Sequence, residues 1–206
     1  MDFWGEGNQY DFSDLSDWVD DIANGGGMNR KVIIVAPSTE HVLTFTDTNN
    51  ARFPAAFQST VGVTGINDDT HGNDSWKLIL GDDNGYGIDI AAIDDFTTIP
   101  WSIGEGGNIF KDVCNSVVFV TGIVALLKQY YDPLTISQLQ QTFKNTGDTE
   151  GDSPKNYGEE SGGSYFSLNP YDENFNFGTY PGNYRIAWGI IDAYETYLYI
   201  KNNIVP

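Results

Sequence analysis

The amino-acid sequence predicts an α/β fold, and three observations point to it. Short runs of β-branched residues alternate with helical runs, which is the pattern of strands and helices that pack in layers. The run KVIIVAPS (31–38) is apolar without alternation, as in a parallel strand that is buried on both of its faces. Forty per cent of the 206 residues are hydrophobic and 14% are aromatic, which is enough for one domain with a sizeable core.

The first half of the chain predicts one helix and three strands. The helix is expected over 13–24, capped by Ser13 or Asp14 and ended by the glycines at 25–27. Its apolar residues recur at helical spacing, and they are Leu15, Trp18, Val19 and Ile22. The predicted strands are 31–38, STVGVTGI (59–66) and YGIDIAA (86–92).

The second half predicts three helices and one insertion. The run 115–131 is apolar almost all round, and it ends before Asp132-Pro133. Thr135 is expected to cap the next helix and Gly147 to end it, with one shared face made by Ile136, Leu139 and Phe143. The terminal helix is expected to begin near Ile190, with one face made by Ile191, Tyr194 and Leu198. The segment 148–183 lacks periodicity and predicts a surface insertion within a single domain that covers 1–206.

Charge and cysteine content disfavour several kinds of partner. The formal net charge is −19, which disfavours nucleic acid and anionic membranes because phosphate neutralisation needs Lys and Arg. This acidity indicates a solvated surface or, in a sharper interpretation, a cation or a basic partner. One cysteine excludes an internal disulfide, and no apolar run approaches the ~20 residues that span a bilayer. The first residues show no charged-then-apolar signal pattern.

The segment DVCNSVVFVTGIVALL (112–127) resembles a known nucleophile helix. It is similar to the signature Gly-Thr-Ser-Met-Ala-x-Pro-His-Val-x-Gly of the subtilisin-like proteases, or subtilases. The shared Val120 and Gly122 fix the comparison and place Cys114 at the catalytic serine. Val118 and Phe119 then take the positions of the family's proline and histidine. The frame of the motif is kept, while its reactive residues differ.

Four more segments resemble subtilase motifs in the family's order and spacing. FPAAFQSTVGVTGI (53–66) is similar to Tyr-Pro-Ala-x-Tyr-x-x-Val-Ile-x-Val-Gly-Ala, and GYGIDIAAID (85–94) to Gly-x-x-Val-Asp-Val-x-Ala-Pro-Gly. LTISQLQQTFKNTGD (134–148) is similar to the helix that follows the nucleophile helix. WGIIDAYE (188–195) is similar to Gly-x-Gly-Leu-Val-Asp-Ala-x-x-Ala near a subtilase C-terminus. The resemblance implies a three-layer subtilisin-like fold with a mostly parallel sheet.

The resemblance also indicates what the chain lacks. DFWGEG (2–7) falls where the family has its substrate-binding strand, so the N-terminal strands that carry the catalytic Asp and His are expected to be missing. The sequence contains neither Asp-Thr-Gly nor His-Gly-Thr. His71 precedes a glycine but lies beyond the oxyanion strand, in the wrong order. His41 is expected to be a loop residue.

Two residues take catalytic positions of the family with altered side chains. Cys114 stands at the nucleophile position, where a thiol is reactive only if a neighbour lowers its pKa. The alternative for this cysteine is a buried, inert thiol. Thr39 stands at the oxyanion asparagine, because Ala36-Pro37-Ser38-Thr39 matches Ala-Ala-Gly-Asn. Losing one oxyanion donor typically slows turnover about 100- to 1,000-fold.

The remaining site predictions follow from the same comparison. The family's substrate-binding segments correspond to Trp4, Gly5, Ala36, Pro37, Ser38, Glu40, Phe53 and Pro54. Glu40 maps to the rim of the specificity pocket, where an acid favours basic substrate residues, or it is one surface acid among many. Phe53-Pro54 matches a dipeptide that often carries a cis peptide bond beside this pocket. Asp89 matches a structural aspartate that is satisfied by hydrogen bonds.

No cofactor is expected, although calcium is possible. Four loop aspartates could supply oxygen ligands, and they are Asp68, Asp69, Asp82 and Asp83. Their spacing does not match an EF-hand loop.

The sequence supports three functional hypotheses. The first is a pseudoprotease, a catalytically degenerate subtilase-like domain that binds a peptide or partner chain or acts in assembly. The second is the C-terminal piece of a split or processed endopeptidase, which uses Cys114 with an Asp and a His from another chain. The third is a surface structural protein. We expect a polypeptide partner and an oligomer or larger assembly, and the resemblance favours a secreted or cell-surface location.

Overall fold

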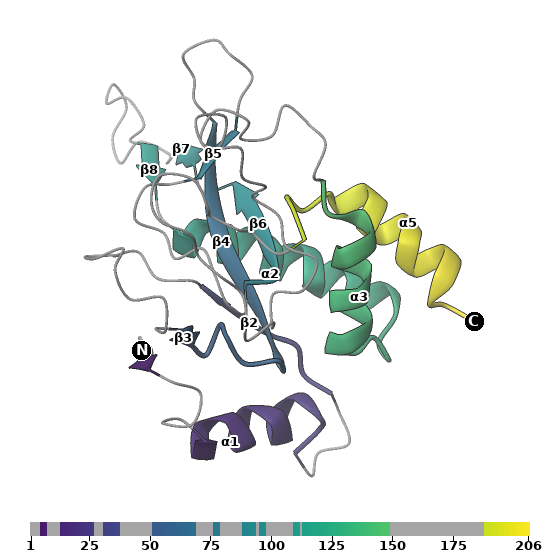
Figure 1. Ribbon diagram of the computed structural model, residues 1–206. Helices are drawn as coiled ribbons and strands as arrows, with labels where there is room; N and C mark the ends of the chain where they lie inside the picture. Colours follow the sequence, from purple (N-terminus) through teal and green to yellow (C-terminus); the bar gives the residue numbers. More distant parts are fainter. Residues whose placement is uncertain are drawn as a thin grey trace, which may run out of the picture.

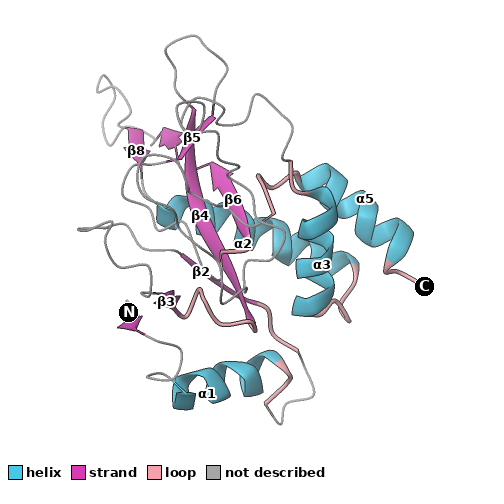
Figure 2. Ribbon diagram, viewed as in Figure 1, coloured by secondary structure: helices cyan, strands magenta, loops and turns pink. Residues whose placement is uncertain are grey.

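The computed structural model gives the chain a mixed architecture of strands and helices (Figures 1 and 2). It describes residues 5–7, 13–26, 31–37, 51–68, 76–78, 88–93, 95–97, 109–111, 113–148 and 188–206. The strands are β1 (Gly5–Gly7), β2 (Ile34–Pro37), β3 (Ala51–Phe53), β4 (Thr60–Asp68), β5 (Trp76–Leu78), β6 (Ile90–Ile93), β7 (Asp95–Thr97) and β8 (Ile109–Lys111). The helices are α1 (Ser13–Ala23), α2 (Val113–Tyr130), α3 (Ile136–Thr146) and α5 (Ala193–Asn203).

A parallel sheet forms the centre of the fold, as the sequence predicted. β4 is its middle strand and pairs in parallel with β2 on one side and β6 on the other. β5 joins the far end of β4 in antiparallel orientation. Two short antiparallel pairs, β1 with β3 and β7 with β8, lie outside this sheet. The predicted α/β class with a parallel sheet is confirmed.

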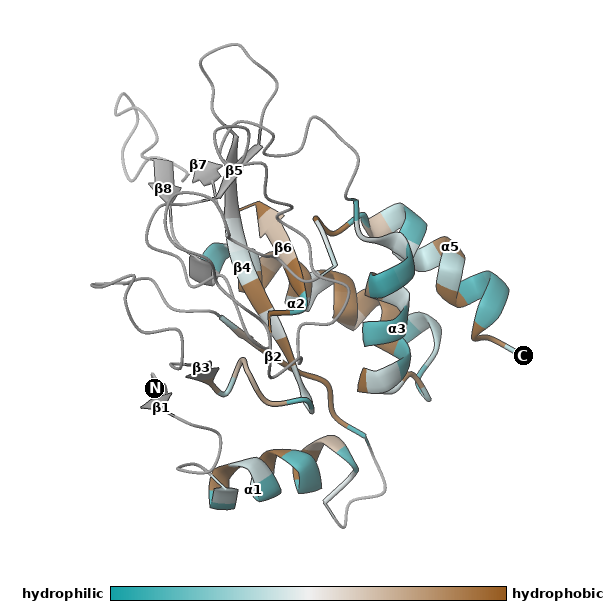
Figure 3. Ribbon diagram, in the orientation of Figure 1, coloured by the Kyte–Doolittle hydropathy of each residue, from teal (hydrophilic) through white to brown (hydrophobic). Residues whose placement is uncertain are grey.

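Helix α2 packs on the sheet and completes the main core. In the view of Figure 1 it runs behind β2, β4 and β6, and it contacts all three strands. Apolar residues of the sheet, α2, α3 and α5 meet there, as the brown segments of Figure 3 show. The fully buried members include Val61, Val63, Ile90, Val120, Leu134, Leu139, Phe143 and Ile200. Helices α3 and α5 pack on each other.

Helix α3 has the ends that its sequence predicts. The hydroxyl of Thr135 accepts a hydrogen bond from the Gln138 backbone, and the Gln138 side chain accepts one from the Thr135 backbone. This reciprocal pair is a capping box, which satisfies two backbone donors at the start of the helix. Gly147 ends the helix, with its N–H donated to the Phe143 carbonyl. Its conformation is extended, so the glycine serves close packing here: an added Cβ would lie 1.8 Å from the Trp188 carbonyl oxygen.

The predicted start of the terminal helix was wrong. Ile190 forms a parallel bridge with Ala91 of β6 and an antiparallel bridge with Asp148, so this residue extends the sheet. Asp192 caps the helix by accepting from the next two backbone N–H groups, and the helix starts at Ala193. The predicted face was also wrong, because Tyr194 is 65% exposed. The buried face of α5 carries Thr196 and Ile200.

Helix α1 begins and ends near the predicted residues, but only part of its predicted apolar face is buried. Val19 and Ala23 are buried and Leu15 is half-buried, whereas Trp18 and Ile22 are exposed. The helix ends where Gly25 and Gly26 adopt positive φ angles of 113° and 38°. Of the predicted insertion 148–183, only Asp148 lies within the described residues.

Candidate functional site

Three of the predicted substrate-binding segments meet beside the parallel sheet. Strand β1 pairs with β3 so that Gly5 lies opposite Phe53. Phe53 is buried and packs with Phe57, their ring centroids 4.6 Å apart, and Ile34 of β2 packs against the same cluster. Ala36 at the end of β2 is buried in a second small cluster with Ala55 and Ile88. The folded chain therefore brings together segments that are distant in sequence.

The peptide bond between Phe53 and Pro54 is cis, as the sequence predicted. Pro54 begins the turn that joins β3 to β4, and the backbone N–H of Phe57 donates a hydrogen bond to the Pro54 carbonyl. Pro37 ends β2 and is exposed. Gly5, Ala36, Phe53 and Pro54 therefore lie on segments that meet in one region of the fold, and their role in substrate binding stays a prediction.

The predicted nucleophile position lies at the start of helix α2. Cys114 is the second residue of that helix, and its side chain lies outside the described residues. Two residues later, the buried hydroxyl of Ser116 donates to the Ala92 carbonyl of β6 at 2.9 Å. This bond fixes the first turn of α2 near the carboxyl end of β6. In open α/β sheets, ligands bind outside the carboxyl ends of the parallel strands.

Several predicted site residues lie outside the described residues, and their roles stay predictions. They are Trp4, Ser38, Thr39, Glu40, His41, His71, Asp69, Asp82 and Asp83, together with the side chain of Asp68. Among the side chains that the structure describes, no group of three or more His, Cys, Asp or Glu could hold a metal ion. Calcium binding is therefore not tested by the described part of the chain.

Asp89 is buried and hydrogen-bonded, as predicted. Its carboxylate accepts the backbone N–H of Gly62 in β4 at 3.0 Å. The side-chain amide of Gln140 lies 3.5 Å from both carboxylate oxygens and donates to the Gln58 carbonyl at 3.1 Å. Asp89 therefore ties the central strand to α3 and to the turn before β4. These hydrogen bonds satisfy a buried carboxyl group, which would otherwise be costly to bury.

Sequence reasoning missed two contacts that shape this region. Ser116 connects the predicted nucleophile helix to β6, and Gln140 reaches from α3 to Asp89. A serine inside an otherwise apolar helix was an available signal, since a buried hydroxyl needs a partner. The partner of Gln140 was not available, because it is more than fifty positions away in sequence.

Comparisons with known proteins support the fold alone. No family model and no curated protein matches the sequence. Fervidolysin from Fervidobacterium pennivorans, a keratinolytic enzyme related to subtilisin, is 14% identical with a TM-score of 0.51 over 81% of this chain. MycP1 with its N-terminal propeptide removed is 16% identical with a TM-score of 0.51 over 68% of this chain. This chain spans 22% of the length of the first and 53% of the second.

Proposed function

We propose that this chain, whose fold is subtilisin-like, is a catalytically degenerate domain that binds a partner polypeptide. The sequence supports the loss of catalysis, because it has neither of the family's Asp and His motifs. It also has Cys114 in place of the serine and Thr39 in place of the oxyanion asparagine. Residues that act as a catalytic unit fail together, so these changes lower turnover by several orders of magnitude.

The outward face of helix α2 carries the binding proposal. Val118 and Leu126 are 69% and 67% exposed, and Phe119 and Tyr130 are also exposed. Residues 118, 122, 126 and 130 recur at every fourth position and so form one line along the helix. Gly122 lies in the middle of this line, and a Cβ added to it would meet no atom of the described chain within 4 Å. We call Val118, Phe119, Gly122, Leu126 and Tyr130 the α2 outer face.

The opposite side of α2 is already used by the fold. Val120 and Leu127 are buried against the sheet, as are Ile123 and Val124. A helix that is apolar all round normally lies in the interior of a protein. The core covers the inner face of α2, whereas apolar residues of its outer face are exposed to solvent.

The α2 outer face has the size of the apolar centre of a protein interface and not of a whole interface. Four large side chains that are 38% to 69% exposed leave on the order of 300–400 Å² of apolar surface bare. At about 25 cal/mol per Å², burying this surface contributes roughly 8–10 kcal/mol, which is about as large as the free-energy cost of association. A stable complex therefore needs further contacts beside this face. The face also lacks carboxylates: residues 113–130 contain no Asp or Glu, although the chain has 29.

Strand β2 supplies a second surface for association. Within the described residues, β4 pairs with one side of β2 and no strand pairs with the other. The opposite edge of the sheet differs, because Ala91 of β6 exchanges backbone hydrogen bonds with Gly189 and Ile191. Unpaired strand edges favour the addition of another strand. A partner strand, such as one from a missing N-terminal half of the fold, would extend the sheet at this edge.

Light scattering of the purified chain at micromolar concentration tests this proposal. We expect a mass above that of the monomer, or soluble protein only in complex with a partner polypeptide. Leu126→Glu should shift the mass towards the monomer, because it places a charge in the α2 outer face. Tyr194→Glu is the matched control, since Tyr194 is 65% exposed on α5, and it should leave the mass unchanged. A stable, well-folded wild-type monomer would refute the assembly argument.

A peptidase assay tests the loss of catalysis separately. The purified chain should not cleave casein or fluorogenic peptides. Robust turnover that disappears in Cys114→Ala would replace the pseudoprotease with an enzyme that uses this thiol.

The second candidate is a split endopeptidase, and one observation favours it. The cis bond at Phe53-Pro54 and the pairing of Gly5 with Phe53 agree with the backbone that the family resemblance implies for a substrate-binding wall. Cys114 is the second residue of α2, and Ser116 bonds the first turn of this helix to β6. A chain that supplied an Asp and a His there would give Cys114 a base and a residue to orient that base, with Thr39 still in place of the oxyanion asparagine. An upstream coding region with Asp-x-Gly and His-Gly-Thr motifs, and peptide cleavage when its product is added, would support this candidate over the first.

A further inference from the structure

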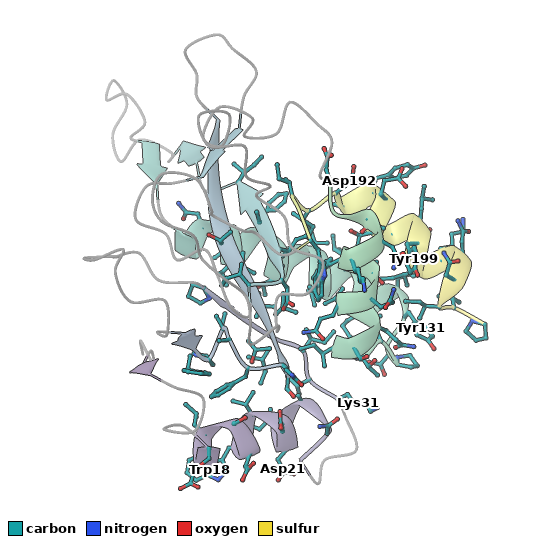
Figure 4. The ribbon with its side chains drawn as sticks, in the orientation of Figure 1. Trp18, Asp21, Lys31, Tyr131, Asp192 and Tyr199 are labelled. Atoms are coloured by element: carbon teal, nitrogen blue, oxygen red, sulfur yellow. The ribbon has the colours of Figure 1, made fainter. Side chains whose placement is uncertain are left out.

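Helix α1 divides into an inner face that the fold uses and an outer face that it leaves exposed. The inner side chains are buried or half-buried, and they are Leu15, Ser16, Val19, Asp20 and Ala23. The outer side chains are exposed, and they are Asp14, Asp17, Trp18, Asp21 and Ile22. Figure 4 shows Trp18 and Asp21 projecting from the side of α1 that lies away from the sheet. We call these five residues the α1 outer face.

Contacts within the chain account for the inner face. Val19 is buried against Phe53 and Phe57, and Leu15 packs on the same cluster. The carboxylate of Asp20 accepts a hydrogen bond from the Ser59 hydroxyl, just before β4. These contacts fix the position of α1 and explain the residue types on its inner side.

Asp14 lies in the first turn of α1, where a negative charge favours the helix, but neither folding nor helix stability accounts for the other four residues of the outer face. Trp18 is 69% exposed and Ile22 is 50% exposed, so two large apolar side chains lie in water one helical turn apart. Asp17 and Asp21 are like charges at i and i+4, an arrangement that destabilises a helix. Asp21 also lies in the last turn of α1, where a negative charge opposes the helix dipole. The outer face thus costs stability in the free chain.

We propose that the α1 outer face binds a polypeptide segment that carries Lys or Arg beside large apolar side chains. Four of the eleven residues of α1 are aspartates and none is basic, so a cationic partner is electrostatically complementary. Asp17 precedes Trp18 and Asp21 follows it by one turn. A cation held by these carboxylates would also lie near the indole ring, where cation–π attraction adds to the ion pair. Within protein interfaces, tryptophan is among the residues that most often contribute a large share of the binding energy.

This surface selects a different partner from the α2 outer face. The α2 outer face has no carboxylate and suits an uncharged apolar surface, whereas the α1 outer face is rimmed by aspartates. The two inferences are independent, because α1 packs on the Phe53 cluster and α2 packs on the main core. Either one can fail without the other.

A binding assay with a defined peptide tests the inference. The probe is a short fluorescent peptide whose leucines and lysines are spaced to form an amphipathic helix. Its binding to the full chain is measured by fluorescence anisotropy. Trp18→Ser should weaken binding about tenfold or more, because it removes the apolar anchor. Asp17→Asn with Asp21→Asn should weaken binding and reduce its dependence on salt concentration. The matching leucine–glutamate peptide should not bind.

Control variants separate this site from general attraction to an acidic protein. Tyr194 and Glu195 are an exposed aromatic and a neighbouring acid on α5, so Tyr194→Ser with Glu195→Gln is the matched change. This control, and Leu126→Glu on the α2 outer face, should leave peptide affinity unchanged. Equal weakening in the control, or equal affinity of Trp18→Ser and wild type, would overturn the proposal. All of these side chains are exposed, and circular dichroism should show unchanged folding.

Discussion

Replacing Gly147 by alanine should destabilise the protein by about 3 kcal/mol or more. The added Cβ would lie 1.8 Å from the Trp188 carbonyl oxygen and 2.7 Å from its carbon, both of them backbone atoms. Such an overlap cannot be relieved by a side-chain rotation, and overpacking typically costs about 1–3 kcal/mol before hydrogen bonds are lost. Movement of Trp188 would also strain the bridge between Asp148 and Ile190, whose two hydrogen bonds are 2.8 and 3.0 Å long. Each lost bond costs about 0.5–1.5 kcal/mol more.

Urea denaturation, followed by circular dichroism at one low protein concentration, measures this effect. The midpoint should fall while the slope m stays constant, which identifies a change in stability rather than in compactness. Gly122→Ala is the matched control, since its Cβ meets open space on the exposed side of α2. Alanine is the better helix former by about 1 kcal/mol, so this control should raise the midpoint. A Gly147→Ala midpoint equal to that of wild type would show that residues 188–190 do not close the sheet edge as described.

Three further predictions follow from the fold and the site. Thr135→Ala should cost about 1 kcal/mol in the same urea assay because it removes the capping box, whereas Ser137→Ala on the exposed side of α3 should be nearly neutral. Asp89→Ala should lower the free energy of unfolding by about 1–3 kcal/mol, because it leaves the Gly62 N–H without this carboxylate. Asp89→Asn should lower it by less, because the amide oxygen of asparagine can accept the same hydrogen bond. Cys114 should react with iodoacetamide at neutral pH no faster than an ordinary thiol, and faster labelling than free cysteine, followed by mass spectrometry, would reveal an activated thiolate.

The parts of the fold that could be predicted depend on local signals. The start of α3 follows from a threonine that caps its own helix, and the end of α1 follows from glycines with positive φ. Strands β2, β4 and β6 were found within a few residues because their apolar runs belong to a parallel sheet. The predicted burial of 31–38 on both faces was wrong, because Ile34 and Val35 are half-buried and Pro37 is exposed on a strand that pairs, within the described residues, on one side alone. The cis bond at Phe53-Pro54 was predicted from the family resemblance and is present.

The errors arose where distant residues decide the local structure. Ile190 and Ile191 have helical spacing with the residues that follow, yet their backbones bond to Asp148 and Ala91. Sheet pairing therefore delays the start of α5 to Ala193. No local pattern contains that information, because the partners are about 40 and 100 positions away in sequence.

The candidate site shows the same division between backbone and chemistry. Sequence motifs located the segments that hold Gly5, Ala36 and Phe53, and the structure brings these segments together. The catalytic Asp and His of the family could not be assessed in this way. The sequence lacks both motifs, but another polypeptide could supply these side chains. An assay of turnover with and without such a polypeptide separates the pseudoprotease from the split endopeptidase.

Helices α1 and α2 carry more apolar residues at helical spacing than the core of this chain buries. In both helices, some residues that fit the helical apolar pattern are exposed, namely Trp18 and Ile22 in α1 and Val118 and Leu126 in α2. Periodicity shows that a side chain is suited to burial, but it does not show which surface covers it. Isolated exposed apolar residues are common, whereas aligned ones along a helix indicate an interface. The charges around each line then distinguish the partners: α2 has no carboxylate, and α1 has four. A single partner surface cannot complement both, so the two helices predict two separate contacts.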